Sequence, residues 1–595
     1  LRDATYLPHN GLTSYTGTAK LAVQPVPKMK LKTNVTYHTA DGRTYDHRDV
    51  NGRSYDFNLD GLPAVEKRAY LVGVSGVYAF SERALLSTSF NTFSTASKYA
   101  PEHLMDTYWD EWPGYSVDSN GVYNGTIDDD NYNNDADYSD PVQATGFTVG
   151  DDFNPSFRKW KARYNTGTVS LLTQMNKWNQ VKSGFEYRQY SIDWDSKRFL
   201  NDFPYGEKYS SRPTYASAYV QDKMEYNHFI VNLGVRFDYR DADISYNVTP
   251  REFTATYKRA DSKSRFSPRL GVSFPISDKS VMHFNYGVYY QEPNYTYMYT
   301  NVQGDVSTGY PLLGNPDLEP EQTSAYELGL DHLIGDELRF DVTAYYKDVE
   351  DLVTTRSSYK VAGRGVTYFT NADYGSVKGI DVSLEKLPIS GLLSGSISYG
   401  YMIATGIASY AKEPYYTYIT STTDTLAPTT EYPLDFDQRH TVTAVLNYRV
   451  PAGWQGRAFG MKLPSAWAVT MVGHYGSGLP YTPTDASGNR LGERNEGRLP
   501  ANYTVDMRLN KDFSFGGGKQ PLSFFVEVDN LFNRHNVIDV YSRTGQADDD
   551  GLRIGSGWTT EEEKQTWSHY NELYDHDPQN FSPPRTVRVG MELSF

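Results

Sequence analysis

The 595-residue sequence contains no cysteine. This absence excludes disulfide bonds, thiolate metal sites and cysteine-based catalysis. No apolar run approaches the roughly 18 residues that a membrane-spanning helix needs. Basic residues are in the minority, because 57 Lys and Arg stand against 73 Asp and Glu, and the formal net charge is -16. Since nucleic acid is bound through basic clusters, this balance argues against nucleic acid as a partner.

Motifs of known catalytic sites are also missing. We find no G-x-S-x-G, no H-E-x-x-H and no glycine loop of the kind that cradles phosphate. The 12 His residues are scattered without a spacing typical of metal ligands. We therefore predict that the chain is not an enzyme and that it carries no cofactor.

Aromatic residues, by contrast, are abundant for so hydrophilic a chain. There are 51 Tyr, and aromatics make up 15% of the residues, whereas the mean hydropathy is -0.61. This combination favours polar loops and rings of interfacial aromatics over a large dry core. It is compatible with a transmembrane barrel, because alternate residues of each strand face a polar interior.

Segments of about ten residues with alternating apolar and polar side chains recur throughout the chain. In residues 585–595, for example, the apolar positions are Val587, Val589, Met591, Leu593 and Phe595. Because successive side chains of a strand point to opposite faces, each segment predicts a strand with one apolar face. Nineteen strands are predicted, at residues 11–24, 26–38, 69–80, 84–94, 165–176, 181–195, 214–226, 228–240, 265–276, 281–291, 322–334, 337–347, 374–387, 392–404, 438–450, 466–478, 501–513, 521–531 and 585–595.

Alternation of apolar and polar residues does not identify the fold class, because the strands of a soluble sandwich alternate as well. The lengths of the connections between the strands distinguish the classes. Tight links such as 81–83 and 335–336 alternate with long ones at 95–164, 241–264, 292–321, 405–437, 479–500 and 532–584. All tight turns therefore lie at one end, as in an outer-membrane barrel with short periplasmic turns and long external loops. A propeller would show a fixed repeat, and a Greek-key sandwich would not sort its loops by length.

The count of nineteen is odd, whereas single-chain bacterial barrels have an even number of strands. The alternation makes the first strand run towards the periplasm, as the last one does. We therefore expect at least one further strand upstream of Leu1, unless the count is in error.

Several stretches together resemble the barrel of TonB-dependent outer-membrane receptors. They are TYASAYVQDKMEY at 214–226, FSPRLGVSFPISDKSVMHFNYGVYYQEP at 266–293, GNPDLEPEQTSAYELGL at 314–330, FDVTAYYKDVEDLV at 340–353, GSVKGIDVSLEK at 375–386, FFVEVDNLFNRHNV at 524–537 and the strand that ends on Phe595. No single piece is decisive, but their order is specific.

The resemblance implies an all-β, antiparallel, up-and-down transmembrane barrel of about 22 strands, with about 19 visible over residues 1–595. It implies a globular plug and a TonB-contacting segment, which we expect upstream together with the first strands. The implied function is energised uptake of a scarce nutrient (a siderophore, vitamin, glycan or peptide) across the Gram-negative outer membrane. The implied partners are that nutrient, outer-membrane lipid and lipopolysaccharide, the TonB complex reached through the plug, and the assembly machinery, which would read Val589, Met591, Leu593 and Phe595.

Aromatics of the external loops are the candidate ligand-binding residues. We single out Trp109, Trp112, Tyr295, Tyr297, Tyr299, Tyr415 and Tyr416. Rings above a pore can stack on sugars or cover a hydrophobic nutrient, although membrane anchoring and packing within the loops are alternative roles. Below them, the polar faces of the strands, including Arg236, Asp238 and Arg240, would line the lumen around the plug.

An acidic run at 128–140 is a candidate calcium loop, with Asp128, Asp129, Asp130, Asp135 and Asp137 as oxygen ligands. It lacks the glycine and terminal glutamate of the EF-hand pattern, so a solvated loop tip is the alternative. Residues 548–550 are a similar, shorter acidic run. Residues 314–321 (GNPDLEPE) could also offer carboxylates, but their prolines favour a rigid entry into the next strand.

Two other function classes remain open on the sequence. One is a passive porin-like channel or a structural barrel that forms part of a surface complex. The other is a secreted, soluble carbohydrate-binding β-protein.

Overall fold

In the computed structural model, the described residues are 11–43, 63–101, 105–106, 156–198, 205–249, 256–304, 312–361, 364–389, 391–419, 430–458, 461–462, 464–485, 487–515, 520–551 and 580–593. They contain nineteen strands of eight or more residues, which are β1 (Leu12–Val26), β2 (Met29–Arg43), β3 (Pro63–Ser81), β4 (Ala84–Pro101), β5 (Ser156–Gln174), β6 (Asn179–Arg198), β8 (Thr214–Tyr226), β9 (Phe229–Asp241), β12 (Lys263–Ser277), β13 (Ser280–Gln291), β15 (Glu321–Ile334), β16 (Leu338–Val361), β17 (Arg364–Lys386), β18 (Leu393–Gly406), β20 (His440–Val450), β23 (Trp467–Gly476), β26 (Asn502–Phe515), β27 (Gln520–Asp529) and β28 (Thr586–Leu593). The predicted antiparallel barrel sheet is confirmed.

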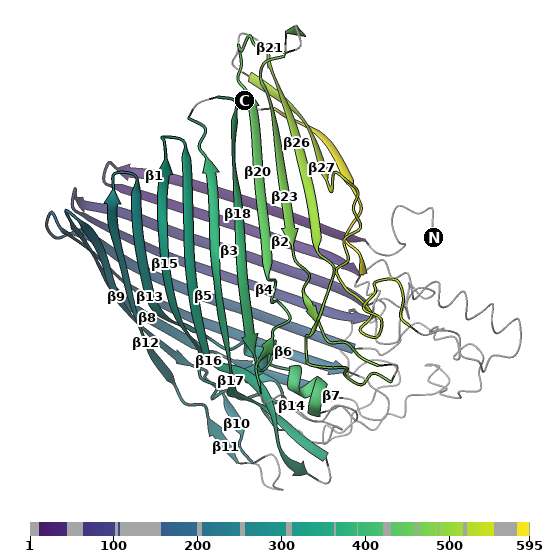
Figure 1. Ribbon diagram of the computed structural model, residues 1–595. Helices are drawn as coiled ribbons and strands as arrows, with labels where there is room; N and C mark the ends of the chain where they lie inside the picture. The colour runs from purple at the N-terminus through teal and green to yellow at the C-terminus, as the bar shows by residue number, and fades with distance from the viewer. Residues whose placement is uncertain are drawn as a thin grey trace, which may run out of the picture.

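Each of these strands is hydrogen-bonded, in antiparallel register, to the next long strand along the chain. Figure 1 shows the sheet curled round, so that β1–β4 run behind β15–β23. Within the described residues, β1 pairs with β2 and β28 with β27, and no pairing joins β1 to β28. The topology is therefore a meander in which sequence neighbours are spatial neighbours.

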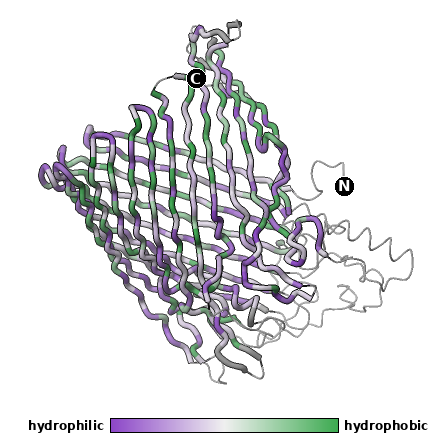
Figure 2. The backbone as a smooth tube through the Cα atoms, in the orientation of Figure 1, coloured by the Kyte–Doolittle hydropathy of each residue, from purple (hydrophilic) through white to green (hydrophobic). Residues whose placement is uncertain are grey.

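The two faces of the sheet differ in the way the alternation predicts. Leu233 on β9 lies opposite Leu270 on β12, and both point outward, with Leu233 54% exposed. The adjacent pair, Gly234 opposite Arg269, points inward. Along the strands, hydrophilic and hydrophobic residues alternate in Figure 2. The outer face carries the apolar band that a lipid bilayer requires, and the inner face is polar.

This assignment predicts opposite outcomes for two neighbouring residues. Leu233→Arg would place a cation on the lipid face and should destabilise the barrel by about 2–4 kcal/mol if the site lies near the bilayer midplane. Asn232→Arg, which faces inward, is the control and should cost far less. Unfolding in lipid vesicles, followed by the heat-modifiable gel mobility of the folded barrel, measures both. Equal losses would contradict the assignment of faces.

Several strands extend well beyond the predicted ends. β16 and β17 have 24 and 23 residues, whereas about 9–11 residues cross a bilayer. Their pairing shifts register between Val349 and Leu352, and Asp351 there has a positive φ of 59°. Such a bulge breaks the period of two, so the alternation is lost although the hairpin continues. β4 likewise runs to Pro101 and β5 begins at Ser156, inside the predicted loop 95–164.

The buried apolar core lies at the long-loop end of the sheet. It contains Ala242, Ala260, Met298, Tyr299, Val302, Leu318, Val353, Phe369 and Ala411. Two short helical segments lie in this region, the helix α1 (Tyr295–Tyr299) and the π-helix η5 (Tyr415–Ile419). None of the helices in the described residues is long and apolar enough to cross a membrane.

Candidate ligand-binding site

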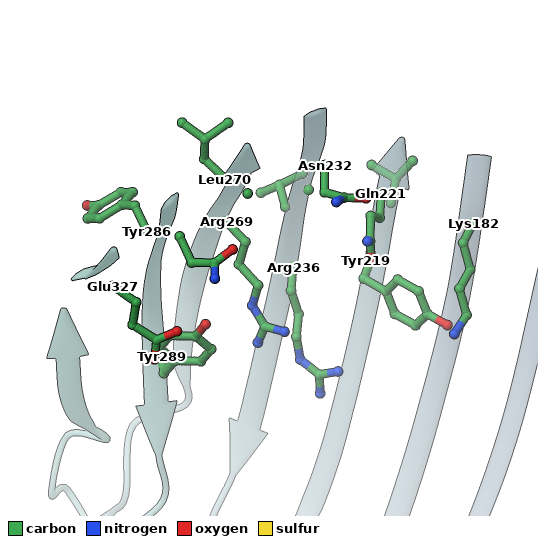
Figure 3. A pocket seen from close by; sticks show the side chains of 15 residues that line it. Lys182, Tyr219, Gln221, Asn232, Arg236, Arg269, Leu270, Tyr286, Tyr289 and Glu327 are labelled. Carbon is green, nitrogen blue, oxygen red and sulfur yellow. The ribbon is translucent and has the colours of Figure 1, made fainter. Parts of the chain in front are cut away.

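The inner wall formed by β6, β8, β9, β12, β13 and β15 has a hollow of about 640 Å³ (Figure 3). Its polar lining includes Lys182, Tyr219, Gln221, Asn232, Arg236, Arg269, Asn285, Tyr289 and Glu327. In Figure 3 the side chains of Arg236 and Arg269 extend in the same direction from adjacent strands. The hollow thus combines cationic groups, phenol rings and amides.

Glycines on both sides of Arg269 create part of this space. Gly234 and Gly287 are its direct partners on β9 and β13. A Cβ at Gly287 would lie 2.8 Å from the ring of Tyr289, closer than real Cβ contacts occur. Glycine at this position therefore lets the Tyr289 ring lie against the wall beneath the guanidinium of Arg269, whose carbon is 4.8 Å from the ring centroid.

The cations of the hollow differ in how they are neutralised. Arg236 is paired with Asp238 on its own strand, with 2.8 Å between guanidinium and carboxylate. Lys182 lies over the ring of Tyr219 at 6.0 Å. Within the described part of the chain, neither Lys182 nor Arg269 has a carboxylate within ion-pair distance. The hollow therefore has positive charge available for an anionic group.

A second hollow of about 260 Å³ lies on the same wall nearer the long loops. It shares Arg236 and Arg269 with the first hollow, and its two other cations are already engaged, because Lys263 and Arg265 both bind Glu319, at 2.9 and 2.5 Å. Arg240, which is 2% exposed, pairs with Glu292 at 2.8 Å. Burial raises the pKa of Glu292 above its ordinary value, and the adjacent Arg240 opposes that shift. Thus Arg240 is buried beneath the loops, away from the open lumen.

The carboxylates of residues 314–321 connect this segment to neighbouring loops by hydrogen bonds and ion pairs. Asp317 accepts hydrogen bonds from the hydroxyl of Tyr246 at 2.7 Å, the backbone N–H of Asp261 at 2.6 Å and the ammonium of Lys258 at 3.1 Å. Burial alone would raise the pKa of Asp317, but these three donors lower it below its ordinary value. Both acidic residues before the strand, Asp317 and Glu319, are thus held by this chain's own groups.

The candidate tyrosines of 295–299 lie at the long-loop end of the sheet, in or against its buried core. Asn294 caps α1 by accepting from the N–H of Thr296 at 2.8 Å. Tyr299 is completely buried, and its hydroxyl donates to the carbonyl of Ala242 at 2.9 Å. Tyr295 contacts the ring of Tyr190, at a centroid distance of 5.4 Å, and Tyr297 that of Phe369, at 4.9 Å. These rings pack the loops onto the sheet.

Of the remaining candidates, Tyr416 is 57% exposed and lies 5.3 Å from the Tyr415 ring. Trp109, Trp112 and the acidic residues Asp128, Asp129, Asp130, Asp135 and Asp137 lie outside the described residues. So does Phe595. In the described ranges, no group of three or more His, Asp or Glu side chains is arranged to hold a metal ion. Val589 and Met591 of the last strand point outward, 74% and 70% exposed.

Two buried carboxylates join loop 407–439 to loop 477–501. Glu413 contacts the guanidinium of Arg494 and accepts from the hydroxyl of Tyr432 at 2.7 Å. Asp437 binds Arg439 at 2.7 Å and Arg498 at 2.5 Å. Both carboxylate side chains are 0% exposed, so these ion pairs are shielded from solvent. They hold the two loops together.

The sequence prediction included Arg236 but missed Lys182, Tyr219, Arg269 and Tyr289. The signal that could have found them is strand register. All four share the polar parity of their strands, and pairing brings Lys182 opposite Gln221 and Arg269 opposite Gly234. Alternation identifies the inward face of each strand but not which inward residues of different strands lie at the same height.

Comparisons with known proteins identify relatives of the chain. Residues 24–531 match the family model described as TonB dependent receptor-like, beta-barrel. The chain is 33% identical over 106 residues to an iron-regulated outer membrane virulence protein of Vibrio cholerae, and 21% identical over 316 residues to the vitamin B12 transporter BtuB of Photobacterium profundum. These matches span 16% and 48% of the two relatives.

Solved structures show the same fold at low sequence identity. The outer membrane transporter YddB from Escherichia coli has a TM-score of 0.61 and 13% identity, with 89% of this chain and 66% of that one covered. The siderophore receptor PirA from Acinetobacter baumannii has a TM-score of 0.58 and 14% identity, covering 98% and 70%. At this identity the likeness shows the architecture alone.

Proposed function

Because the chain belongs to the TonB dependent receptor-like β-barrel family, we propose that it forms the wall of a receptor that imports a scarce small nutrient. Its relatives are transporters and receptors of the Gram-negative outer membrane, not enzymes. Energised import in this family needs a plug that TonB displaces, and the polar inner wall is the surface that such a plug would contact. The plug and the TonB contact are part of the proposal.

The observation that carries the proposal is the cationic hollow on the inner wall. Lys182 and Arg269 offer charge that no described carboxylate neutralises, beside the phenol rings of Tyr219 and Tyr289. Such a wall suits an acidic, partly aromatic or chelating ligand. One relative is named as iron-regulated and another as a vitamin B12 transporter. We therefore propose a metal-carrying nutrient, with an anionic metal chelate as the first class to test.

Growth on a limiting metal tests this function. The complete gene is expressed in a Gram-negative host that lacks its own receptors, and a panel of iron chelates and cobalamin is supplied with and without functional TonB. We expect one class of compound to support growth only when TonB is functional. TonB-independent growth would instead indicate a passive channel, and no growth on any compound would contradict uptake of this ligand class.

Removing the two available cations should weaken ligand capture. In Lys182→Gln with Arg269→Gln, we expect the affinity for the chelate that supports growth to fall by about 100-fold or more, because two charge-assisted hydrogen bonds are lost and each is worth about 1.5–3 kcal/mol. Lys30→Gln with Lys32→Gln removes the same charge from the inner face of β2 and is the control. Binding to the purified protein measures both. Equal losses in the two variants would contradict a specific role for the hollow.

A further inference from the structure

Three cations stand on the inner face of β12, which runs into the barrel from the long-loop end. Lys263, Arg265 and Arg269 have the same parity, and residues 263–277 contain no acidic side chain. Because a strand rises about 3.3 Å per residue, Arg265 stands about 13 Å nearer the long loops than Arg269. Arg269 lines both hollows of the wall, whereas Lys263 and Arg265 line the smaller one. We call Lys263 and Arg265 the upper pair, and Lys182 and Arg269 the lower pair.

The carboxylate of Glu319 occupies the upper pair in the way a ligand carboxylate would. Its Oε1 lies 2.9 Å from the ammonium of Lys263, and its Oε2 lies 2.5 Å from the guanidinium of Arg265. Each oxygen thus has a cation of its own. Glu319 belongs to a segment 54 residues further along the chain than Arg265, so this anion comes from outside the wall strands.

The Glu319 side chain can leave the upper pair without unfolding of its segment. The backbone N–H of Glu319 donates to the side-chain oxygen of Asn371 at 2.8 Å, and the amide nitrogen of Asn371 donates to the carbonyl of Glu319 at 2.9 Å. Leu318 is completely buried, and the ring of Pro320 fixes its own φ. The Glu319 side chain is itself 35% exposed, so water can solvate its carboxylate after a rotamer change.

Other acidic residues near the upper pair are engaged elsewhere. Asp238 lies directly opposite Arg265, but its two oxygens accept from the Nε of Arg236 at 2.9 and 3.0 Å. Within the described residues, Glu319 is the only carboxylate within ion-pair distance of Lys263 or Arg265. Departure of its side chain would therefore leave two neighbouring cations unpaired.

We propose that the upper pair is a second anion site of the wall, which takes a carboxylate group of an incoming ligand when Glu319 is displaced. Charge-assisted hydrogen bonds from Lys and Arg serve a ligand carboxylate as they serve that of Glu319. This competition lowers the affinity of the upper pair, whereas no carboxylate of the described residues competes for the lower pair. An anion therefore passes from the weaker site to the stronger one, into the lumen. The direction of transfer rests on the proposed uptake, but the competition does not.

Isothermal titration of the purified full chain in detergent with citrate tests the competition. Lys182→Gln with Arg269→Gln serves as the background, because it removes the lower pair. In that background, Glu319→Gln should raise the affinity for citrate about 10-fold, since partly exposed ion pairs are each worth up to about fivefold and two of them no longer compete. Adding Lys263→Gln and Arg265→Gln should abolish this gain.

Glu337→Gln in the same background is the matched control. The Glu337 carboxylate is 30% exposed and pairs with Lys386 at 2.6 Å at the tight-turn end of the sheet, so citrate affinity should not change. Three results would overturn the proposal. These are unchanged or unmeasurable citrate binding by the Glu319→Gln variant, an equal gain in Glu337→Gln, and a gain that persists without the upper pair.

Two further measurements separate a displaced side chain from a loosened segment. Heat-modifiable mobility must show folded barrel in each variant, and hydrogen exchange must show residues 314–321 protected as in the wild type; a gain that comes only with lost protection would contradict the proposal. If the background folds poorly, Glu319→Gln in the wild-type chain should increase the citrate bound at a fixed, subsaturating concentration. Failure of every chelate to support growth would contradict uptake, whereas unchanged citrate affinity would contradict this site whatever the growth result.

Discussion

Replacing Arg494 with methionine is expected to separate the two loops that it joins. The change leaves Glu413, whose side chain is 0% exposed, without its cationic partner. Breaking a buried ion pair by removing one member costs about 3–5 kcal/mol, because the other charge stays buried and unpaired. The hydroxyl of Tyr432 remains as a donor to Glu413 but does not replace the charge. We therefore expect loop 407–439 to open far more often in the variant.

The loss should depend on pH. Burial raises the pKa of Glu413 above its ordinary value of 4.5, and Arg494 opposes that shift, so the variant's pKa should be higher still. The closed state then binds more protons than the open state between 4.5 and the raised pKa. The contribution of Glu413 to the stability of the closed loops is thus fully present below pH 4.5 and is lost as the pH rises through the raised pKa. Methionine at 494 should widen this window.

Hydrogen exchange at the backbone of loop 407–439, followed from acid to neutral pH, measures the opening. Arg339→Met is the control, because it breaks an ion pair with Asp331 in which the arginine is 55% exposed. Exposed pairs contribute about 0–1 kcal/mol, so exchange should barely change there. An Arg494→Met protein with wild-type protection at neutral pH would contradict a bracing role for the buried pair.

Replacing Tyr299 with alanine is expected to release α1 from the sheet. Its side chain is completely buried in the core of the loop end, against the ring of Tyr209 at 5.6 Å. Truncating a buried aromatic to alanine costs about 3–5 kcal/mol, since the removed ring leaves a cavity. Limited proteolysis near α1 and exchange at Thr300, whose N–H donates to the carbonyl of Thr296, report the release.

Two further substitutions separate the contribution of the buried ring from that of its hydrogen bond and from that of an exposed tyrosine. Tyr299→Phe keeps the ring but removes the hydrogen bond to Ala242, and should cost about 0.5–1.5 kcal/mol. Tyr416→Ala removes a tyrosine of loop 407–439 that is 57% exposed, and should leave α1 in place. If Tyr416→Ala loosened α1 as much as Tyr299→Ala, burial would not be the cause.

The strands could be predicted from the sequence because one local rule governs them. Residues 214–226 were predicted as a strand, and β8 is Thr214–Tyr226. A lipid-facing strand must be apolar at every second position, so the pattern is strong wherever the strand touches the bilayer. Above the bilayer this constraint ends, and the predicted strand 337–347 stops well short of Val361 in β16.

The candidate site could be predicted only in part, since it depends on distant segments. Alternation indicates that Arg236, Asp238 and Arg240 share a face, but Arg240 is covered by Met298 and Leu318 of a later loop. The Nη1 of Arg240 lies 3.6 Å from the sulfur of Met298, 58 residues along the chain. No local sequence pattern indicates a contact between segments so far apart in the chain. The same reason explains why Tyr299, predicted as an exposed ligand candidate, is completely buried.

The meander topology also bears on how barrels of this kind change size. Each long strand pairs only with its chain neighbours among the long strands described, so one hairpin is a self-contained piece of wall. Losing or duplicating two consecutive strands would keep every remaining strand antiparallel and every side chain on its original face. Gain or loss of one strand would reverse the direction of all that follow. The wall can therefore grow or shrink by hairpins, through duplication or deletion of short coding segments, without redesign of the rest.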